Sequence, residues 1–242
     1  MRPLSVKRSV LTLATLIGAA CSSSTSPNTP TAPLIYALVT SVGSGPNPLH
    51  WLEQVQVLNG AGTAVNGSAL VSVNGTVLAF DSTTGSYFGY RIIAPGETVT
   101  LNVTVGSTTY TAQGVQFTTF PTITTTADSA VWPRSAANIV TWTAGAPTTG
   151  ASYLLGLYSS NGRCQYPASL CPKETPAATS TLTDTIAANT IVAPAGVYQL
   201  GVGIGTTGIN IGAPGTGIQI PGAGTGSGLW IGAVSYVTVI VQ

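Results

Sequence analysis

Apolar and polar residues alternate along most of the chain beyond residue 34, and this pattern predicts β-strands. The alternation is clearest over residues 98–105, where valine or leucine takes every odd position and threonine or asparagine every even one. Because successive side chains of a strand point to opposite faces, the odd positions would face a core. No stretch after residue 20 keeps a helical period over three turns with capping residues, so we expect an all-β fold.

Turn residues separate these short apolar runs along the globular part of the chain. Asn-Gly pairs favour hairpin turns because both residues readily adopt positive φ, and they occur at residues 59–60, 66–67, 74–75 and 161–162. Many short strands at this spacing suggest one or two β-sandwich modules. We expect strands over residues 35–42, 54–58, 69–73, 76–80, 87–92, 98–105, 108–117, 122–126, 137–143, 152–158, 180–186, 197–205 and 233–241.

A module boundary is expected near Phe120 and Pro121, which gives modules of residues 34–120 and 121–242. In the second module, residues 139–143 place Trp142 in an early strand. Residues 194–202 place Tyr198 in a late one. This arrangement resembles immunoglobulin-like and fibronectin type III-like modules. The resemblance implies that Trp142 lies in the core and that the late strand packs across from it.

The first module resembles the same class more loosely, through residues 71–75 and 94–99. Many unrelated functions occur on this fold. The resemblance therefore implies an architecture and no particular activity.

Residues 1–20 have the three-part layout of a secretory signal peptide. Basic residues Arg2, Lys7 and Arg8 precede an apolar run over residues 10–17, and small residues follow at 18–20. The apolar run is too short to be a stable membrane span. We therefore expect export and removal of this segment.

Cys21 follows the small residues directly, and residues 16–21 resemble the lipobox of bacterial lipoproteins. The sequence departs from that motif at Gly18, where the family usually has leucine. The resemblance implies cleavage before Cys21, lipidation of its sulfur and, through Ser22, sorting to the outer membrane. The alternative is an ordinary signal peptide with a cysteine near its cleavage site.

Residues 21–33 comprise Cys21 and a run of serine, threonine and proline with single asparagine and alanine residues. Such a composition cannot form a core, so we expect an extended, flexible tether. Together, Cys21 and this run predict a lipid-anchored protein of the bacterial cell envelope.

Charge is scarce, because only 5% of residues are charged against about 25% in ordinary soluble domains. Without residues 1–20 the chain keeps four basic and six acidic residues, a net charge of −2. Binding of nucleic acid needs a clustered positive surface, so nucleic acid is not expected as a partner. No later apolar run reaches the roughly 18 residues of a spanning helix, which argues against a multi-span membrane protein.

Two cysteines remain besides Cys21. Cys164 and Cys171 lie seven positions apart, and in an oxidising envelope compartment we expect them to form a disulfide. The alternative is a metal pair, which needs two further ligands that the neighbouring sequence does not offer.

Catalytic motifs are weak throughout. His50 is the only histidine, and its nearest acidic neighbour is Glu53, but no Gly-x-Ser-x-Gly motif accompanies them. The acidic residues are scattered singly, and Asp81 precedes a turn sequence. Residues 203–208 match Gly-x-Gly-x-x-Gly, yet neither a helix nor a later acidic residue follows. We therefore expect no enzyme, metal site or cofactor.

Aromatic residues raise the alternative of carbohydrate binding, because an exposed indole can cover the C–H face of a sugar. Trp51, Trp132 and Trp230 are the candidate ligand surface. Residues 205–228 form a glycine-rich insertion, interpreted as either a flexible hairpin or a disordered loop. We expect it to be dispensable for the core and, if ordered, to be a binding surface.

The leading hypothesis is a non-enzymatic cell-envelope lipoprotein with a role in adhesion, scaffolding or partner binding. Its partners would be the membrane, through the lipid anchor, and an unidentified envelope protein or glycan. The second hypothesis is a carbohydrate-binding surface lipoprotein, and the third is an envelope hydrolase that uses His50.

Overall fold

The computed structural model describes residues 32–42, 50–125, 127–143, 151–160, 164–167, 172–176, 182–206 and 217–242. All regular elements within these residues are strands, which confirms the predicted all-β class. Among them there is no helix long and apolar enough to cross a membrane. The strands are β1 (Leu34–Val42), β2 (His50–Leu58), β3 (Ala69–Val73), β4 (Thr76–Val77), β5 (Ala79–Asp81), β6 (Ser86–Gly89), β7 (Thr98–Val105), β8 (Thr108–Val115), β9 (Ala130–Trp132), β10 (Asn138–Thr141), β11 (Ala151–Ser159), β12 (Cys164–Tyr166), β13 (Lys173–Pro176), β14 (Thr183–Ile186), β15 (Gly196–Thr206), β16 (Ile218–Gln219) and β17 (Gly228–Val241).

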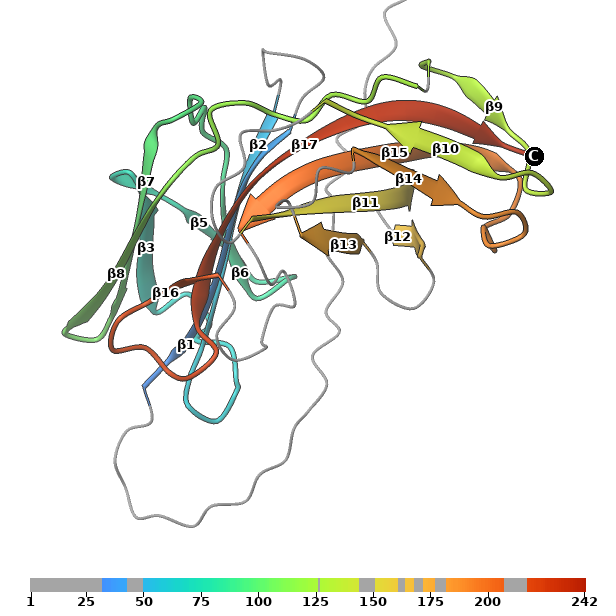
Figure 1. Ribbon diagram of the computed structural model, residues 1–242. Coiled ribbons are helices and arrows are strands. Elements are labelled where there is room, and N and C mark those ends of the chain that lie inside the picture. The colour runs from blue at the N-terminus through green and yellow to red at the C-terminus, as the bar shows by residue number, and fades with distance from the viewer. Residues whose placement is uncertain are drawn as a thin grey trace, which may run out of the picture.

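One large sheet carries two smaller sheets. Its order is β12-β11-β15-β17-β1-β2-β6-β5, with β13 beside β11 and both β9 and β16 beside β17. The smaller sheets are β4-β3-β7-β8 and β10-β14. Figure 1 shows them over opposite ends of the large sheet. The molecule therefore contains two β-sandwiches that share one sheet.

Strand β17 belongs to both sandwiches. Its first part pairs in parallel with β1, from Tyr36 opposite Gly228 to Val42 opposite Val234. Its later part pairs antiparallel with β15. Odd-numbered side chains of β17 enter both cores, so the two smaller sheets cover the same face of the large sheet.

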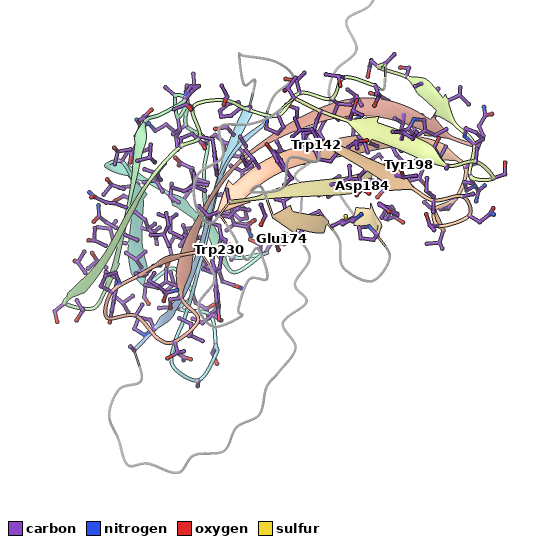
Figure 2. The ribbon with its side chains drawn as sticks, in the orientation of Figure 1. Trp142, Glu174, Asp184, Tyr198 and Trp230 are labelled. Carbon is purple, nitrogen blue, oxygen red and sulfur yellow. The ribbon has the colours of Figure 1, made fainter. Side chains whose placement is uncertain are left out.

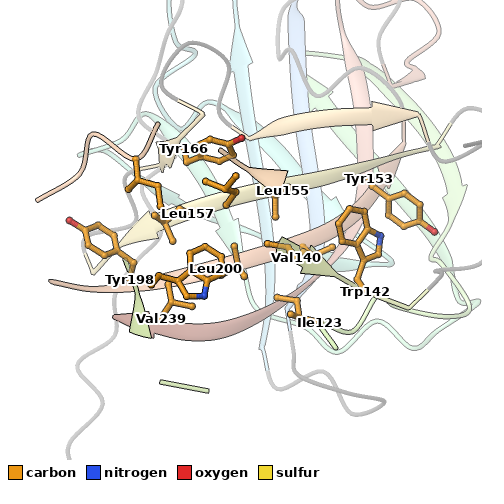
Figure 3. Packing of buried hydrophobic residues seen from close by; sticks show 14 of the residues in the cluster. Ile123, Val140, Trp142, Tyr153, Leu155, Leu157, Tyr166, Tyr198, Leu200 and Val239 are labelled. Carbon is orange, nitrogen blue, oxygen red and sulfur yellow. The ribbon is translucent and has the colours of Figure 1, made fainter. Parts of the chain in front are cut away.

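Each sandwich has its own apolar core, and the two cores are built from different stretches of chain. The first combines residues 35–112 with three side chains from the end of the chain, Ile220, Leu229 and Ile231. The second comprises residues from Phe117 to Val241 (Figure 3), including Val140, Leu157, Leu200 and Val239. Below, "first sandwich" and "second sandwich" denote the units around these two cores.

Most expected strands are present, but the structure differs from the expectation at several places. Residues 76–80 divide into β4 and β5, and the described residues 122–125 form only an isolated bridge between Ile123 and Trp142. Strands β9, β12, β13 and β16 were not expected, and β17 begins at Gly228 rather than at residue 233. The sequence hides the start of β17 because glycine interrupts its apolar positions.

The expectation that residues 205–228 are dispensable for the core is wrong for residues 217–228. Ile220 is buried in the first core, with Ile218 and Ala223 packed against that core. A buried hydrogen bond runs from the Ile35 amide to the Ser227 hydroxyl, 3.0 Å. Residues 207–216 lie outside the described residues. The described end of the stretch closes the first sandwich beside β8, where a Cβ on Gly114 would collide with the side chains of Ile218 and Ile231.

The chain crosses from the first core to the second just after β8. Gln116 is buried there and donates hydrogen bonds from Nε2 to the Ser41 hydroxyl, 2.8 Å, and to the Gly232 carbonyl, 3.1 Å. Phe117, the next residue, already belongs to the second core. This crossing lies close to the boundary expected at Phe120 and Pro121.

Candidate functional site

The tryptophans proposed as a ligand surface are largely inaccessible. Trp132 and Trp230 are only 5% and 1% exposed, so neither can offer a ring face to a sugar, and that prediction is wrong for both. The side chain of Trp51 lies outside the described residues. Trp142, labelled in Figure 2, is buried, as predicted. It packs edge-to-face against Tyr153 with ring centroids 5.7 Å apart (Figure 3).

Position on the sheet explains the burial of Trp230. Its side chain lies on the opposite face of β17 from the first core. Gly217 covers the indole there, since a Cβ at that position would lie 2.8 Å from Cε2 of Trp230. The sequence placed Trp230 at the end of a flexible stretch, whereas the structure places it within a paired strand.

The other predicted site residues are only partly described. Cys21 and Cys171 lie outside the described residues. Cys164 lies in β12 and is half-buried. Its disulfide with Cys171 stays a prediction, because Cys171 lies outside the described residues. His50 begins β2, but its side chain is not described.

Several charged side chains have structural hydrogen bonds. Asp81 accepts a hydrogen bond from the Thr83 amide, 2.8 Å, which lowers the pKa of its carboxyl and confirms the predicted turn chemistry. Asp128 accepts one from the Thr238 amide, 2.8 Å, with the same effect on its pKa. These carboxylates therefore stabilise turns and strand ends.

A second group of charges lies between the Asn74 turn and the start of β7. Glu97 pairs with Arg91 and accepts hydrogen bonds from the Ala94 amide, 2.9 Å, and from the Asn74 amide group, 2.9 Å. These interactions, the Ala94 hydrogen bond first, lower the pKa of Glu97. The ends of β3 and β7 are thereby held together.

Glu53 differs from every other described acidic residue. It lies on the core-facing side of β2, opposite Val39 of β1 and Gly89 of β6, and none of its surface is exposed. Neither carboxyl oxygen has a hydrogen-bond partner. Burial raises the pKa of Glu53 to about 7. The positive charge of Arg91 lowers this pKa, but by less than burial raises it.

A glycine makes room for this carboxyl group. A Cβ on Gly89 would lie 2.5 Å from Oε2 of Glu53 and would also collide with Leu78. With no exposed surface, Glu53 cannot reach a substrate, so it is a titratable group of the core rather than a catalytic one. Sequence reasoning considered Glu53 only as a partner for His50. It overlooked that Glu53 interrupts the apolar series that continues at Val55 and Val57.

Two tyrosine rings lie on the face of the large sheet that is opposite the two cores. Tyr158 lies over Gly156, where a Cβ would be 2.6 Å from its phenol oxygen, and Tyr236 lies over Gly201. The two rings meet edge-to-face with centroids 5.8 Å apart. Burial raises both phenol pKa values, that of Tyr236 to about 12. The side chains of Tyr158 and Tyr236 therefore cover Gly156 and Gly201 on this face.

The outer face of the β4-β3-β7-β8 sheet is the most regular polar surface of the described residues. Alternation directs valine and leucine of β7 and the residues Tyr110, Ala112 and Gly114 of β8 inward, and it directs threonine, asparagine and glutamine of both strands outward. We call the outward polar side chains the polar ladder: Ser72, Thr98, Thr100, Asn102, Thr104, Thr109, Thr111 and Gln113. All are exposed or half-buried, and none is charged.

Hydrogen bonds between neighbouring strands fix the polar ladder. Thr104 and Thr109 hydroxyls lie 2.9 Å apart, Thr111 donates to Asn102 Oδ1 at 2.8 Å, and Gln113 donates to Thr100 at 3.2 Å. Threonine is also restricted at χ1, so the rungs are held in place before any ligand arrives. The ladder is therefore a preorganised array of hydroxyl and amide groups.

Exposed apolar side chains border the polar ladder. Leu70 and Val77 occupy the same face on β3 and β4, and Val115 lies opposite Thr98 at the end of β8. These three side chains are 57–61% exposed. The face can therefore offer both hydrogen bonds and apolar contact.

The described residues contain no group of three or more histidine, cysteine or acidic side chains that could hold a metal ion. Comparison with known proteins adds no identification. No family model matches the chain, and no curated protein is similar to it in sequence.

Proposed function

We propose that this protein is a non-enzymatic lipoprotein of the cell envelope that binds an extracellular or envelope partner through the polar ladder. The observation that carries the proposal is the array itself: eight uncharged polar side chains on three adjacent strands, tied by three cross-strand hydrogen bonds. Hydroxyl and amide groups of ordinary acidity bind ligands and position them, but they supply no general acid or base.

The lipid anchor supports this assignment. The lipobox resemblance ends at Cys21, and the first strand begins at Leu34, so residues 22–33 would separate the membrane from the first sandwich. Twelve extended residues span at most about 43 Å. A tether of that length would let the ladder face partners beyond the membrane surface. Two or three acyl chains give stable anchoring.

An oxidising envelope compartment also favours a disulfide between Cys164 and Cys171. It would fasten a short excursion from β12, at the edge of the large sheet. Non-reducing peptide mapping should recover the two cysteines in one linked peptide, and labelling of both as free thiols would contradict the pairing.

Membrane fractionation tests the anchor. The native protein should sediment with membranes, and its mature N-terminal peptide should begin at Cys21 and carry acyl groups in mass spectrometry. Cys21→Ser should release the protein into the soluble fraction, whereas the matched variant Cys164→Ser should stay in the membrane. An unmodified N-terminus elsewhere, or membrane retention of Cys21→Ser, would contradict the lipoprotein assignment.

A further inference from the structure

We infer that the polar ladder binds a neutral polyhydroxylated polymer, namely a polysaccharide without charged substituents. This inference names the partner class of the proposed function, and it relies on that function only for presentation of the ladder outside the cell. It replaces the proposed stacking of sugar rings on Trp132 and Trp230, because both indoles are buried.

Charge defines the class of polymer. The polar ladder contains no ionisable side chain, and the charges next to it, Arg91 and Glu97, pair with each other. A nucleic acid or an acidic glycan would require clustered basic residues. A neutral polymer has no such requirement, and the lack of charge avoids the cost of removing water from unpaired ions.

Hydrogen-bonding capacity matches sugar hydroxyls, which both donate and accept. Asn102 accepts from Thr111 and keeps its amide N–H groups for a ligand, while Gln113 donates to Thr100 and keeps its carbonyl. In the Thr104–Thr109 pair one hydroxyl donates, so the hydrogen of the other stays available. The ladder thus offers donors and acceptors side by side at fixed positions.

Length favours a polymer over a single sugar. Along β7 the ladder positions 98, 100, 102 and 104 are two residues apart, which corresponds to about 7 Å per step and about 20 Å in all. A face of that length meets several sugar units at once. Weak contacts at each unit then combine, because later contacts become intramolecular.

Apolar neighbours complete the match. Leu70, Val77 and Val115 are the exposed large apolar residues on this face. Sugar rings carry C–H faces between their hydroxyl edges, so contact with these side chains removes apolar surface of both partners from water. A protein partner with a purely polar surface would gain nothing from them.

Co-sedimentation with insoluble polysaccharides tests the inference. The full-length mature protein, purified in detergent, is incubated with cellulose, chitin and an insoluble β-1,3-glucan, and soluble starch and heparin serve as competitors. We expect saturable binding to at least one neutral polymer. Starch or excess soluble neutral glycan, but not heparin, should reduce it.

Matched variants locate the site. The double variant Asn102→Ala/Thr111→Ala removes one hydrogen-bonded rung and should weaken binding about tenfold, since two polar contacts of roughly 0.7 kcal/mol each are lost. Thr124→Ala/Thr141→Ala is the control, because these residues form an equivalent exposed threonine pair, 2.8 Å, in the second sandwich. Melting curves should show both variants folded.

Each outcome decides the inference. Loss of binding in the ladder variant alone supports it, and equal loss in both variants or in neither overturns the site. Binding to heparin alone, or to no polysaccharide, overturns the ligand class. Neither result affects the anchor, which fractionation of Cys21→Ser tests separately.

Discussion

The two sandwiches share a sheet but are assembled differently from the chain. The first takes most of its core from residues 35–112 and completes it with Ile220, Leu229 and Ile231, more than a hundred residues later. The second takes its buried residues from 117–204 and 233–241, on either side of the segment that completes the first core. The first sandwich therefore depends on contacts between residues more than a hundred positions apart, and such long-range contacts slow folding in general. The comparison shows that a boundary in the sequence need not be a boundary of the core.

The two sandwiches also accommodate carboxyl groups differently. Glu53 of the first is fully buried without a hydrogen-bond partner. Asp184 of the second is partly exposed and accepts hydrogen bonds from Lys173 Nζ at 2.6 and 2.8 Å. Burial without a partner favours the neutral acid, whereas a partly exposed ion pair adds little to stability.

Truncation of Ile220 should have the largest effect. Ile220→Ala removes a buried side chain that closes the first core, so we expect a loss of about 2–5 kcal/mol in the free energy of unfolding. Urea denaturation measures the loss. Hydrogen exchange should show weakened protection in β3 and β7 before β11 and β15.

Ile139→Ala is the matched control, because Ile139 is 58% exposed in β10 and should change stability by less than about 0.5 kcal/mol. An equally small effect of Ile220→Ala would mean that residues 217–228 are dispensable after all. The comparison between the sandwiches would then lose its main support.

Glu53 should make the first sandwich less stable as pH rises. Its pKa in the folded protein is about 7, against an ordinary 4.5. Below pH 4.5 both folded and unfolded chains are protonated, and the stabilisation is complete. Between pH 4.5 and 7 only the unfolded chain loses its proton, so up to about 3 kcal/mol is lost by pH 7 and not regained above it.

Glu53→Gln isolates this contribution, because the other carboxyl groups titrate equally in both proteins. We expect the difference in unfolding free energy between the two proteins to change across pH 4–8, whereas Glu97→Gln should not reproduce that change. The pKa of Glu97 is lowered by its hydrogen bonds, so its stabilisation is lost as pH falls. A constant difference between wild type and Glu53→Gln would show that Glu53 is hydrated or paired.

Local pattern was enough to predict the fold class and most strands. Alternation over residues 98–105 predicted both the buried face of β7 and the outward threonines. The turn at Asp81 and the burial of Trp142 were also predicted correctly. These features depend on side-chain periodicity and short-range hydrogen bonds, which a sequence displays directly.

Contacts between segments far apart in the chain could not be predicted from the sequence in this way. Glycine-rich composition suggested that residues 205–228 were an insertion, yet Ile220 fills a core more than a hundred residues away in sequence. Trp230 was placed on the surface because its strand begins within that composition. The polar ladder was missed as a site because each threonine has an ordinary role in a strand, and only the pairing of β3, β7 and β8 brings them together.

Removal of the partly exposed ion pair between Lys173 and Asp184 should have the smallest effect. Lys173 lies on β13 and Asp184 on β14, so their pair links the large sheet to the small sheet of the second sandwich, and their side chains are 40% and 16% exposed. Solvent screens such a pair, so Lys173→Met should cost less than about 1 kcal/mol. Asp184→Ala should cost somewhat more, because it also removes the oxygen that accepts a hydrogen bond from the Thr185 amide at 2.8 Å. A double-mutant cycle at low and high salt measures the coupling, which should shrink with added salt. A coupling energy above about 3 kcal/mol that does not change with salt concentration would mean that this pair is as shielded from solvent as Glu53. The two sandwiches would then not differ in how they accommodate carboxyl groups.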